Sequence, residues 1–211
     1  MSTNLSLIWY ACYGSNVLYK DGFLCYIKGG RRGGCSEHEN GCGDKTTPRC
    51  DKNIDIPFPL YFAESSQKWN NGGVAFIGLS KDENNLTAGR MYLITNDQFT
   101  DVVKQENNNQ IISIDFEKVI KKGSYVFRKS WYGNIIYLGS DEEYPIFTFT
   151  HYKNIKDQKF NSPSSEYIQI IAKGLKEKRK WNKEEIADYL IRKNGIKEYF
   201  DEKGLIEKLN V

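Results

Sequence analysis

A glutamate on the apolar face of a helix is the residue of this sequence best suited to chemistry. The segment TNDQFTDVVKQEN (residues 95–107) begins with Thr95 and Gln98 at capping-box spacing, which predicts a helix start. The apolar residues that follow at helical spacing are Phe99, Val102 and Val103. Glu106 is the i+7 position of that face, where burial would raise its pKa and make it a candidate general base. The alternative is that the apolar stripe simply runs out into solvent at the helix end.

A second feature is an abrupt strand end in YACYGSN, residues 10–16. The residues suited to a buried strand are Tyr10, Ala11, Cys12 and Tyr13. They are followed at once by residues that favour a turn, which are Gly14, Ser15 and Asn16. A core strand that stops in this way brings a tight turn directly to the edge of the core.

The elements that must position these residues follow from the hydrophobic pattern. We expect a first strand over residues 7–13, a short helix over 18–27 and a long loop over 29–56, since the last segment has no apolar period. Long loops of this kind are disordered or act as lids and binding loops. Six apolar runs then predict further strands, enough for a strongly curved sheet or a small barrel: PLYFA, GVAFIGL, AGRMYLIT, SYVFRKSW, NIIYLGS and IFTFT.

The C-terminal third changes to a helical period. Ser162 and Pro163 predict an N-cap and first turn, and the helical positions after them are Tyr167, Ile168, Ile171 and Leu175. Asn182 and Glu185 have capping-box spacing, and Asn194-Gly195 predicts a stop. The fold class is therefore α+β, with a domain over residues 1–176 and a helical C-terminal extension over 177–211 packed on it.

Three segments together resemble the γ-glutamyl cyclotransferase family. YACYGSN is similar to its strand-and-turn signature, QE at the end of the predicted helix is similar to its catalytic segment, and SPSSEYIQIIAKGLKE is similar to its late helix. The three occur in the family's order. The resemblance implies a small mixed β-barrel flanked by helices. It departs from the family pattern after Glu106, where family members commonly have Gly and this chain has Asn107.

The resemblance also implies a reaction and a site. The α-amine of a γ-glutamyl compound would attack its own γ-carbonyl, releasing 5-oxoproline and an amine or amino acid.

Glu106 would be the general base, Asn16 would brace the turn, and Tyr167 would contact the substrate. The residues lining the substrate pocket would be Tyr10, Ala11, Cys12, Tyr13, Gly14 and Ser15. Backbone N–H groups of such a turn can bind an anion without a cationic side chain. The reaction needs no metal and no cofactor, and nothing in the sequence selects among γ-glutamyl amino acids, γ-glutamylamines and glutathione.

Two other function classes stay open. One is a non-catalytic protein that binds a γ-glutamyl-like metabolite, in which Glu106 would pair with a cation or turn outward. The other is an interaction or nucleic-acid-binding module that uses a basic tail. Residues 153–211 carry 14 Lys and Arg against 10 Asp and Glu, but the signs are interleaved as on a solvated helical surface. We therefore expect a small-molecule partner and neither nucleic acid nor a membrane.

Composition bounds the remaining expectations. The chain has 211 residues, a net charge of +3 and no run of eighteen apolar residues, so we expect a soluble cytoplasmic protein. Five cysteines without an export signal read as free thiols. Loop residues with metal-binding side chains are Cys35, His38, Cys42 and Cys50. Their spacing matches no standard zinc pattern, so we expect no metal.

Overall fold

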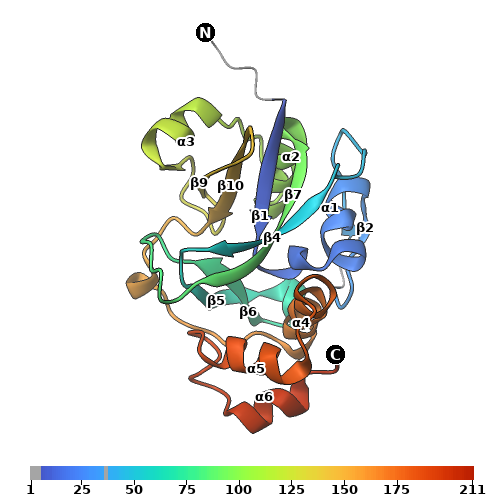
Figure 1. Ribbon diagram of the computed structural model, residues 1–211, viewed down its shortest axis with the longest axis vertical. Helices are drawn as coiled ribbons and strands as arrows, with labels where there is room; N and C mark the ends of the chain where they lie inside the picture. Colours follow the sequence, from blue (N-terminus) through green and yellow to red (C-terminus); the bar gives the residue numbers. More distant parts are fainter. Residues whose placement is uncertain (1–5, 36–37) are drawn as a thin grey trace.

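A six-stranded mixed sheet forms the centre of the protein (Figure 1). The computed structural model describes residues 6–35 and 38–211. Neighbouring strands of the sheet follow the order β4-β7-β1-β10-β9-β8, in which β1 and β10 are parallel and the other pairs antiparallel. The bounds are β1 Leu7–Cys12, β4 Asp51–Ile56, β7 Thr87–Thr95, β8 Ser124–Val126, β9 Asn134–Asp141 and β10 Tyr144–Thr150.

β1 lies in the interior of this sheet because its side chains are apolar on both faces. Every residue from Leu7 to Cys12 is buried, as expected for a strand that is covered on both sides. The predicted strand over residues 7–13 is thus confirmed, one residue shorter. Each of the six predicted apolar runs contains a strand, but in SYVFRKSW only Ser124–Val126 forms one. Two of the strands form a separate pair, β5 Leu60–Ser66 and β6 Gly72–Ile77.

The expected barrel is not closed in the described residues. The end strands β4 and β8 pair with only one neighbour each, and β5–β6 forms its own two-stranded sheet. Where β6 meets β10, a side chain replaces the backbone ladder: Ile77 N–H donates to Thr150 Oγ1 (3.0 Å), which donates to Ile77 O (2.7 Å). The physical reason is that β8 has only three residues and β4 is a polar edge strand, so neither extends a ladder across the gap.

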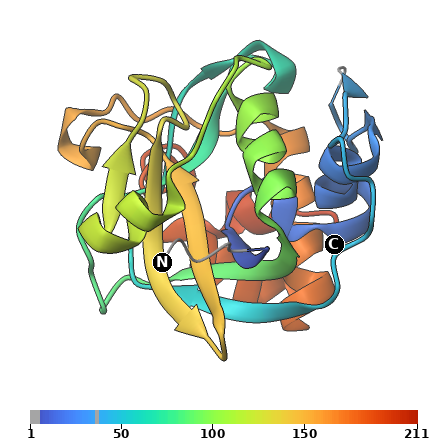
Figure 2. The same ribbon diagram turned by 90° about the horizontal axis from the view of Figure 1, so that it is seen from above.

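The helices lie around the sheet. Their bounds are α1 Leu24–Lys28, α2 Asn96–Glu106, α3 Phe116–Lys122, α4 Ser165–Arg179, α5 Lys183–Ile191 and α6 Glu202–Lys208. The helix α2, green in Figure 2, stands against the sheet. Its Phe99 ring packs on Tyr10 of β1 and Phe149 of β10. α4, α5 and α6 gather at the end of the molecule opposite the start of β1 (Figure 1). Along the described residues, no helix combines the length and apolar character that crossing a bilayer takes.

The capping residues in the sequence predict where the helices begin, with small errors in position. Both predicted capping boxes are confirmed, at Thr95–Gln98 for α2 and Asn182–Glu185 for α5. The predicted N-cap of α4 at Ser162 is wrong, because the Ser164 hydroxyl accepts from the Tyr167 N–H and the helix begins at Ser165. The predicted domain boundary between residues 176 and 177 falls inside α4, which continues to Arg179. The division into a domain and a C-terminal extension stays a prediction.

The segment expected to be a helix over residues 18–27 is split. A π-helical turn at Tyr19–Phe23 precedes α1, which ends where Gly29 adopts φ +83°. The expected loop over 29–56 is wrong in part. It contains β4 and the short pair β2 Gly30–Arg31 and β3 His38–Glu39. β4 escaped detection because an edge strand with polar side chains shows no apolar alternation.

Candidate active site

The turn after β1 is held by neighbouring side chains. β1 ends at Cys12, and the chain turns into a 3-10 helix at Ser15–Val17. Asn16 Nδ2 donates to the Tyr10 hydroxyl (3.1 Å), and the Tyr92 hydroxyl donates to the Asn16 carbonyl (3.0 Å). The turn is thereby fixed to β1 and β7. Asn16 Oδ1 is buried and has no hydrogen-bond partner among the described residues.

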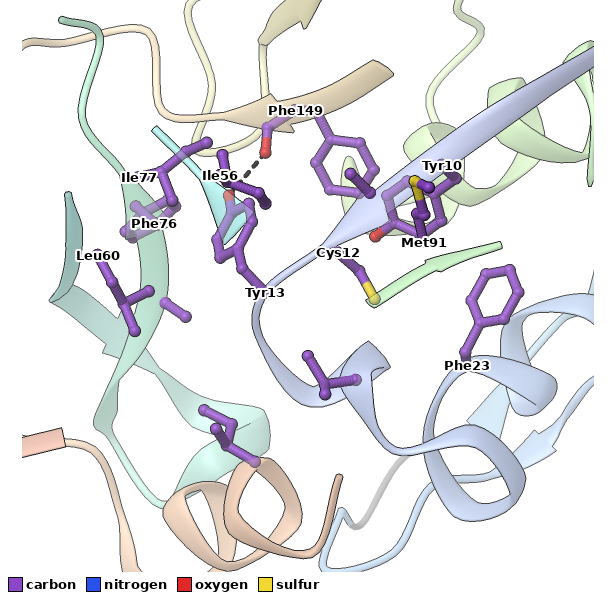
Figure 3. Packing of buried hydrophobic residues seen from close by; sticks show 14 of the residues in the cluster. Tyr10, Cys12, Tyr13, Phe23, Ile56, Leu60, Phe76, Ile77, Met91 and Phe149 are labelled. Atoms are coloured by element: carbon purple, nitrogen blue, oxygen red, sulfur yellow. Dashed lines mark hydrogen bonds between the residues drawn. The ribbon is translucent and has the colours of Figure 1, made fainter. Parts of the chain in front are cut away.

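The aromatic residues of YACYG lie in the core beside this turn. Figure 3 shows Tyr10 and Tyr13 at the end of β1, with the Tyr13 hydroxyl donating to the Phe149 carbonyl (2.6 Å). The Tyr10 ring stacks on Phe149 at 5.3 Å between centroids. Both tyrosines are buried and line the same cavity as the turn.

Glu106, the last residue of α2, lines that cavity as well. Its Oε1 accepts a 2.5 Å hydrogen bond from the Tyr26 hydroxyl. Burial raises the pKa of Glu106, and the nearby Arg32 guanidinium and the Tyr26 hydrogen bond oppose this rise without cancelling it. No described cation forms an ion pair with Glu106. The carboxyl is thus half-buried, held by one tyrosine and open to the cavity.

Tyr167 reaches the turn from α4. Its hydroxyl accepts from the Ala75 N–H (3.2 Å) of β6, and it lies 2.9 Å from where a Cβ on Gly14 would be. Burial raises the pKa of Tyr167 to about 12, so the phenol is neutral near pH 7. Gly14 is therefore required by close approach rather than by its backbone conformation, since its φ is −105°.

Two of the predicted pocket residues lie elsewhere. Ala11 and Cys12 are buried but do not line the cavity. The Cys12 thiol donates to the Arg90 carbonyl of β7 (3.2 Å), and Ala11 has no exposed surface. These two positions are core packing of β1. The other predicted site residues all line the cavity, and they are Tyr10, Tyr13, Gly14, Ser15, Asn16, Glu106 and Tyr167.

The cavity has a volume of about 890 Å³, a size suited to a whole small molecule. Its inner wall is the turn with the buried tyrosines. Its rim consists of exposed or half-exposed polar residues, including Asn108, Gln110, Arg128 and Lys129. The charged lining residues are Arg32, Lys68, Arg128 and Lys129 against Glu106. Because Glu39 pairs with Arg32, the exposed pair Arg128 and Lys129 is the part of the lining that favours an anionic ligand.

Comparisons with known proteins give a fold likeness and one curated relative. No family model matches the sequence. Similar solved structures include a human uncharacterized protein (18% identity, TM-score 0.48, 82% of this chain and 80% of that chain). Another is described as a γ-glutamyl cyclotransferase (18% identity, TM-score 0.47, 96% and 99%). A third is a yeast γ-glutamyl cyclotransferase specific to glutathione (11% identity, TM-score 0.39, 97% and 96%).

Solved γ-glutamyl cyclotransferases are thus among the structures that this chain resembles. With identities of 18% or less and TM-scores below 0.5, the likeness says nothing of this chain's activity. The curated relative is histone deacetylase 5 of Arabidopsis thaliana, 35% identical over 200 residues. That match covers 87% of this chain and 30% of the deacetylase, so this chain spans less than a third of the relative's length.

Sequence reasoning missed Arg32, which lines the cavity although it was expected in a loop without apolar period. Its side chain is 4% exposed and forms an ion pair with Glu39 (2.8 Å). It also donates to Ser15 Oγ (3.1 Å), and its guanidinium lies over the rings of Tyr26 (4.9 Å) and Trp69 (5.3 Å). Burial opposes the charge, but Tyr26, Glu106 and Glu39 outweigh it and raise the pKa of Arg32. The burial of Arg32 depends on contacts with residues far away in the sequence, and a local sequence pattern cannot predict such contacts.

Arg32 belongs to a segment that we call the strap, residues 29–35 and 38–50. It is tied to α2 by three side chains. Gln98 Nε2 donates to the Thr46 carbonyl (2.8 Å), Asp101 Oδ2 accepts from the Gly43 N–H (2.9 Å), and Gln105 Oε1 accepts from the Gly41 N–H (2.9 Å). Of the two alternatives expected for this loop, these contacts favour a lid or binding loop over a disordered segment for the described part of the strap.

The strap cysteines are free thiols, as predicted. Cys42 is buried and donates to the Tyr26 and Gln98 carbonyls, whereas Cys50 is exposed. Within residues 6–35 and 38–211, no group of three or more His, Cys, Asp or Glu side chains is placed to hold a metal ion.

We expect Gly14→Val to weaken ligand binding strongly while the protein still folds. The new Cβ would lie 2.9 Å from the Tyr167 hydroxyl and 3.4 Å from Ala75 Cβ, so the added methyl groups must enter the cavity. Affinity for 5-oxoproline or a γ-glutamyl compound should fall by about tenfold or more, seen as loss of the ligand-induced rise in Tm. The matched control is Gly43→Val, whose Cβ makes only ordinary contact at 3.6 Å. A full ligand-induced shift in Gly14→Val would show that ligand binds elsewhere.

Proposed function

We propose that this protein is a γ-glutamyl cyclotransferase-like enzyme that converts a γ-glutamyl compound into 5-oxoproline and a free amine or amino acid. The observation that carries the proposal is that Glu106, with its raised pKa, shares one cavity with the turn at Gly14–Asn16. The sequence motifs that resemble the family supply the two sides of that cavity.

The turn would hold the glutamyl end of the substrate. Gly14 and Ser15 line the cavity, and the absence of a side chain on Gly14 lets a ligand carboxylate approach the backbone of the turn. Asn16 Oδ1 is a buried acceptor without a described partner, which suits the α-ammonium group. Arg32 donates to the Ser15 hydroxyl and so helps to hold the turn at the same end. A γ-glutamyl group presents both charges that these atoms would bind.

Ring closure then requires movement of protons. The α-ammonium must lose two protons in all as its nitrogen bonds to the γ-carbon. The amide C–N bond breaks, and the leaving nitrogen takes up two protons to become an ammonium group. Glu106 would accept a proton from the attacking nitrogen and return it to the leaving nitrogen. Holding both groups of one molecule in the folded geometry supplies much of the rate enhancement.

The decisive experiment is direct. The purified protein is incubated with γ-glutamyl amino acids, γ-glutamylamines and glutathione, and 5-oxoproline is measured. Release from at least one compound supports the enzyme. Binding without 5-oxoproline, seen as a ligand-induced rise in Tm, supports the second candidate, a non-catalytic γ-glutamyl binder. Neither turnover nor binding of any compound would contradict both.

The pH dependence should report Glu106. A base must be ionised, so kcat/KM is expected to rise with pH through the pKa of Glu106 in the free protein. Because burial raises that pKa, the midpoint of the rise should lie above the ordinary range of a glutamate. The measurement is the pH–rate profile of 5-oxoproline release. A rate already at its maximum at the ordinary pKa of glutamate would argue against Glu106 as the base.

A further inference from the structure

The rim of the cavity carries two cations on a loop that is fixed to the end of α2. This loop, residues 127–133, joins β8 to β9. Ser130 Oγ donates to Asn107 Oδ1 (2.6 Å), and Asn107 Nδ2 donates to the Tyr132 carbonyl (3.2 Å). Asn107 follows Glu106 directly, so the 127–133 loop is clamped to the residue next to the proposed base.

The loop is also closed on itself. The N–H groups of Phe127 and Arg128 both donate to the Gly133 carbonyl (3.0 and 3.3 Å), and the Gly133 N–H donates to the Ser130 carbonyl (3.2 Å). A Cβ on Gly133 would lie 2.0 Å from the Arg128 carbonyl oxygen, so only glycine fits there. The backbone that carries Arg128 and Lys129 is therefore set at the cavity rim by its own hydrogen bonds.

Within residues 6–35 and 38–211, no carboxylate pairs with either of the two cations. Arg128 and Lys129 are exposed lining residues, and no described Asp or Glu forms an ion pair with either. Among the described lining residues, the carboxylate is that of Glu106, which is bonded to Tyr26. An anion at the rim would thus meet two cations that no described carboxylate neutralises.

Burial indicates which part of a ligand reaches this rim, because Ser15 and Asn16 of the turn are buried whereas Arg128 and Lys129 are exposed. If the glutamyl end lies at the buried turn, as the proposed function has it, the substituent on the leaving nitrogen must extend toward the mouth. In γ-glutamyl amino acids and peptides that substituent carries a carboxylate, whereas in γ-glutamylamines it is neutral or cationic. Charge complementarity at the rim separates these two substrate classes.

We infer that the 127–133 loop is a leaving-group subsite in which Arg128 and Lys129 bind the carboxylate of the amino acid or peptide attached to the γ-glutamyl group. The substrates are therefore γ-glutamyl amino acids or peptides with a free carboxylate, in preference to γ-glutamylamines. This inference rests on the proposed function for the placement of the glutamyl end. Asn107, the departure from the family pattern noted in the sequence, is the residue that attaches the subsite to α2.

The test uses two compounds that differ by one carboxylate, γ-glutamylalanine and γ-glutamylethylamide. For the full chain, kcat/KM for 5-oxoproline release should be about tenfold higher with γ-glutamylalanine, and added salt should reduce the ratio. In Arg128→Gln/Lys129→Gln the ratio should fall to between about one and two. The matched control is Lys121→Gln/Lys122→Gln, which removes the same charge from exposed positions on α3 outside the cavity and should keep the full ratio.

Equal rates with the two compounds in the unmodified chain would overturn the inference, as would a preference that survives in Arg128→Gln/Lys129→Gln. If neither compound gives 5-oxoproline, the proposed reaction fails for them, and calorimetric binding of the same two compounds decides about the subsite. Tighter binding of γ-glutamylalanine that Arg128→Gln/Lys129→Gln removes would support it. Equal binding, or none, would overturn it.

Discussion

Glu106→Gln is expected to lower kcat for 5-oxoproline release by about a hundredfold or more, because general acid–base catalysis contributes roughly 10²–10⁴-fold. Glutamine keeps the length of the side chain, and its amide oxygen can still accept from the Tyr26 hydroxyl that now bonds Oε1 at 2.5 Å. Only the capacity to take a proton is removed. The measurement is 5-oxoproline release under saturating substrate.

The same substitution should not destabilise the fold. A carboxyl group whose pKa is raised by burial binds protons more readily in the folded than in the unfolded state, so stability falls as pH rises from the unfolded pKa through the folded one. Above that window the ionised carboxylate opposes folding, and glutamine relieves this. We expect an equal or higher Tm near pH 7. Glu83→Gln, an exposed carboxyl away from the cavity, is the control that should change neither property. Near-normal turnover in Glu106→Gln would remove Glu106 from the mechanism.

Arg32→Met is expected to destabilise the protein by about 3 kcal/mol or more, because it leaves Glu39 buried without its counter-ion. For a chain of this length that corresponds to a fall in Tm of roughly 6–12 °C. The loss of the hydrogen bond to Ser15 and of the contacts with Tyr26 and Trp69 adds to it. The measurement is thermal or denaturant unfolding of the single variant beside the unmodified protein.

The double variant Arg32→Met/Glu39→Gln separates charge from packing. If the unpaired carboxylate causes most of the loss, neutralising it should restore part of the stability, and the two substitutions should be non-additive. Additive losses would mean that the ion pair itself matters little and that packing of the guanidinium between the two rings dominates. A single Arg32→Met variant as stable as the unmodified chain would contradict the structural role of the strap.

Much of the fold could be read from the sequence because the relevant signals are local. The capping boxes at Thr95–Gln98 and Asn182–Glu185 satisfy helix N–H groups within one turn, so spacing alone identifies them. The buried strands have continuous apolar runs. Helical spacing predicts that Glu106 lies on the apolar face of α2. In the structure its carboxyl accepts a hydrogen bond from Tyr26, which argues against a helix end that runs out into solvent.

The features that could not be predicted depend on contacts between residues that are far apart in the sequence. Closure of the sheet is decided by strand edges that must find each other, and three residues in β8 leave too little to pair. Arg32 lies in a glycine-rich, polar segment and is buried only because Glu39 and the two aromatic rings surround it. Ala11 and Cys12 were included in the pocket because a motif was carried over as a block, whereas a strand directs only some of its side chains to any one cavity.

α2 makes specific contacts on two of its faces at once. One face packs Phe99 on the sheet and presents Glu106 to the cavity, while another holds the strap through Gln98, Asp101 and Gln105. Inserting or deleting one residue in α2 between Asp101 and Gln105 would rotate the rest of the helix by about 100° about its axis. Glu106 would leave the cavity in the same step that Gln105 releases the strap. The number of residues from Thr95 to Glu106 is therefore constrained more tightly than the identity of most of them.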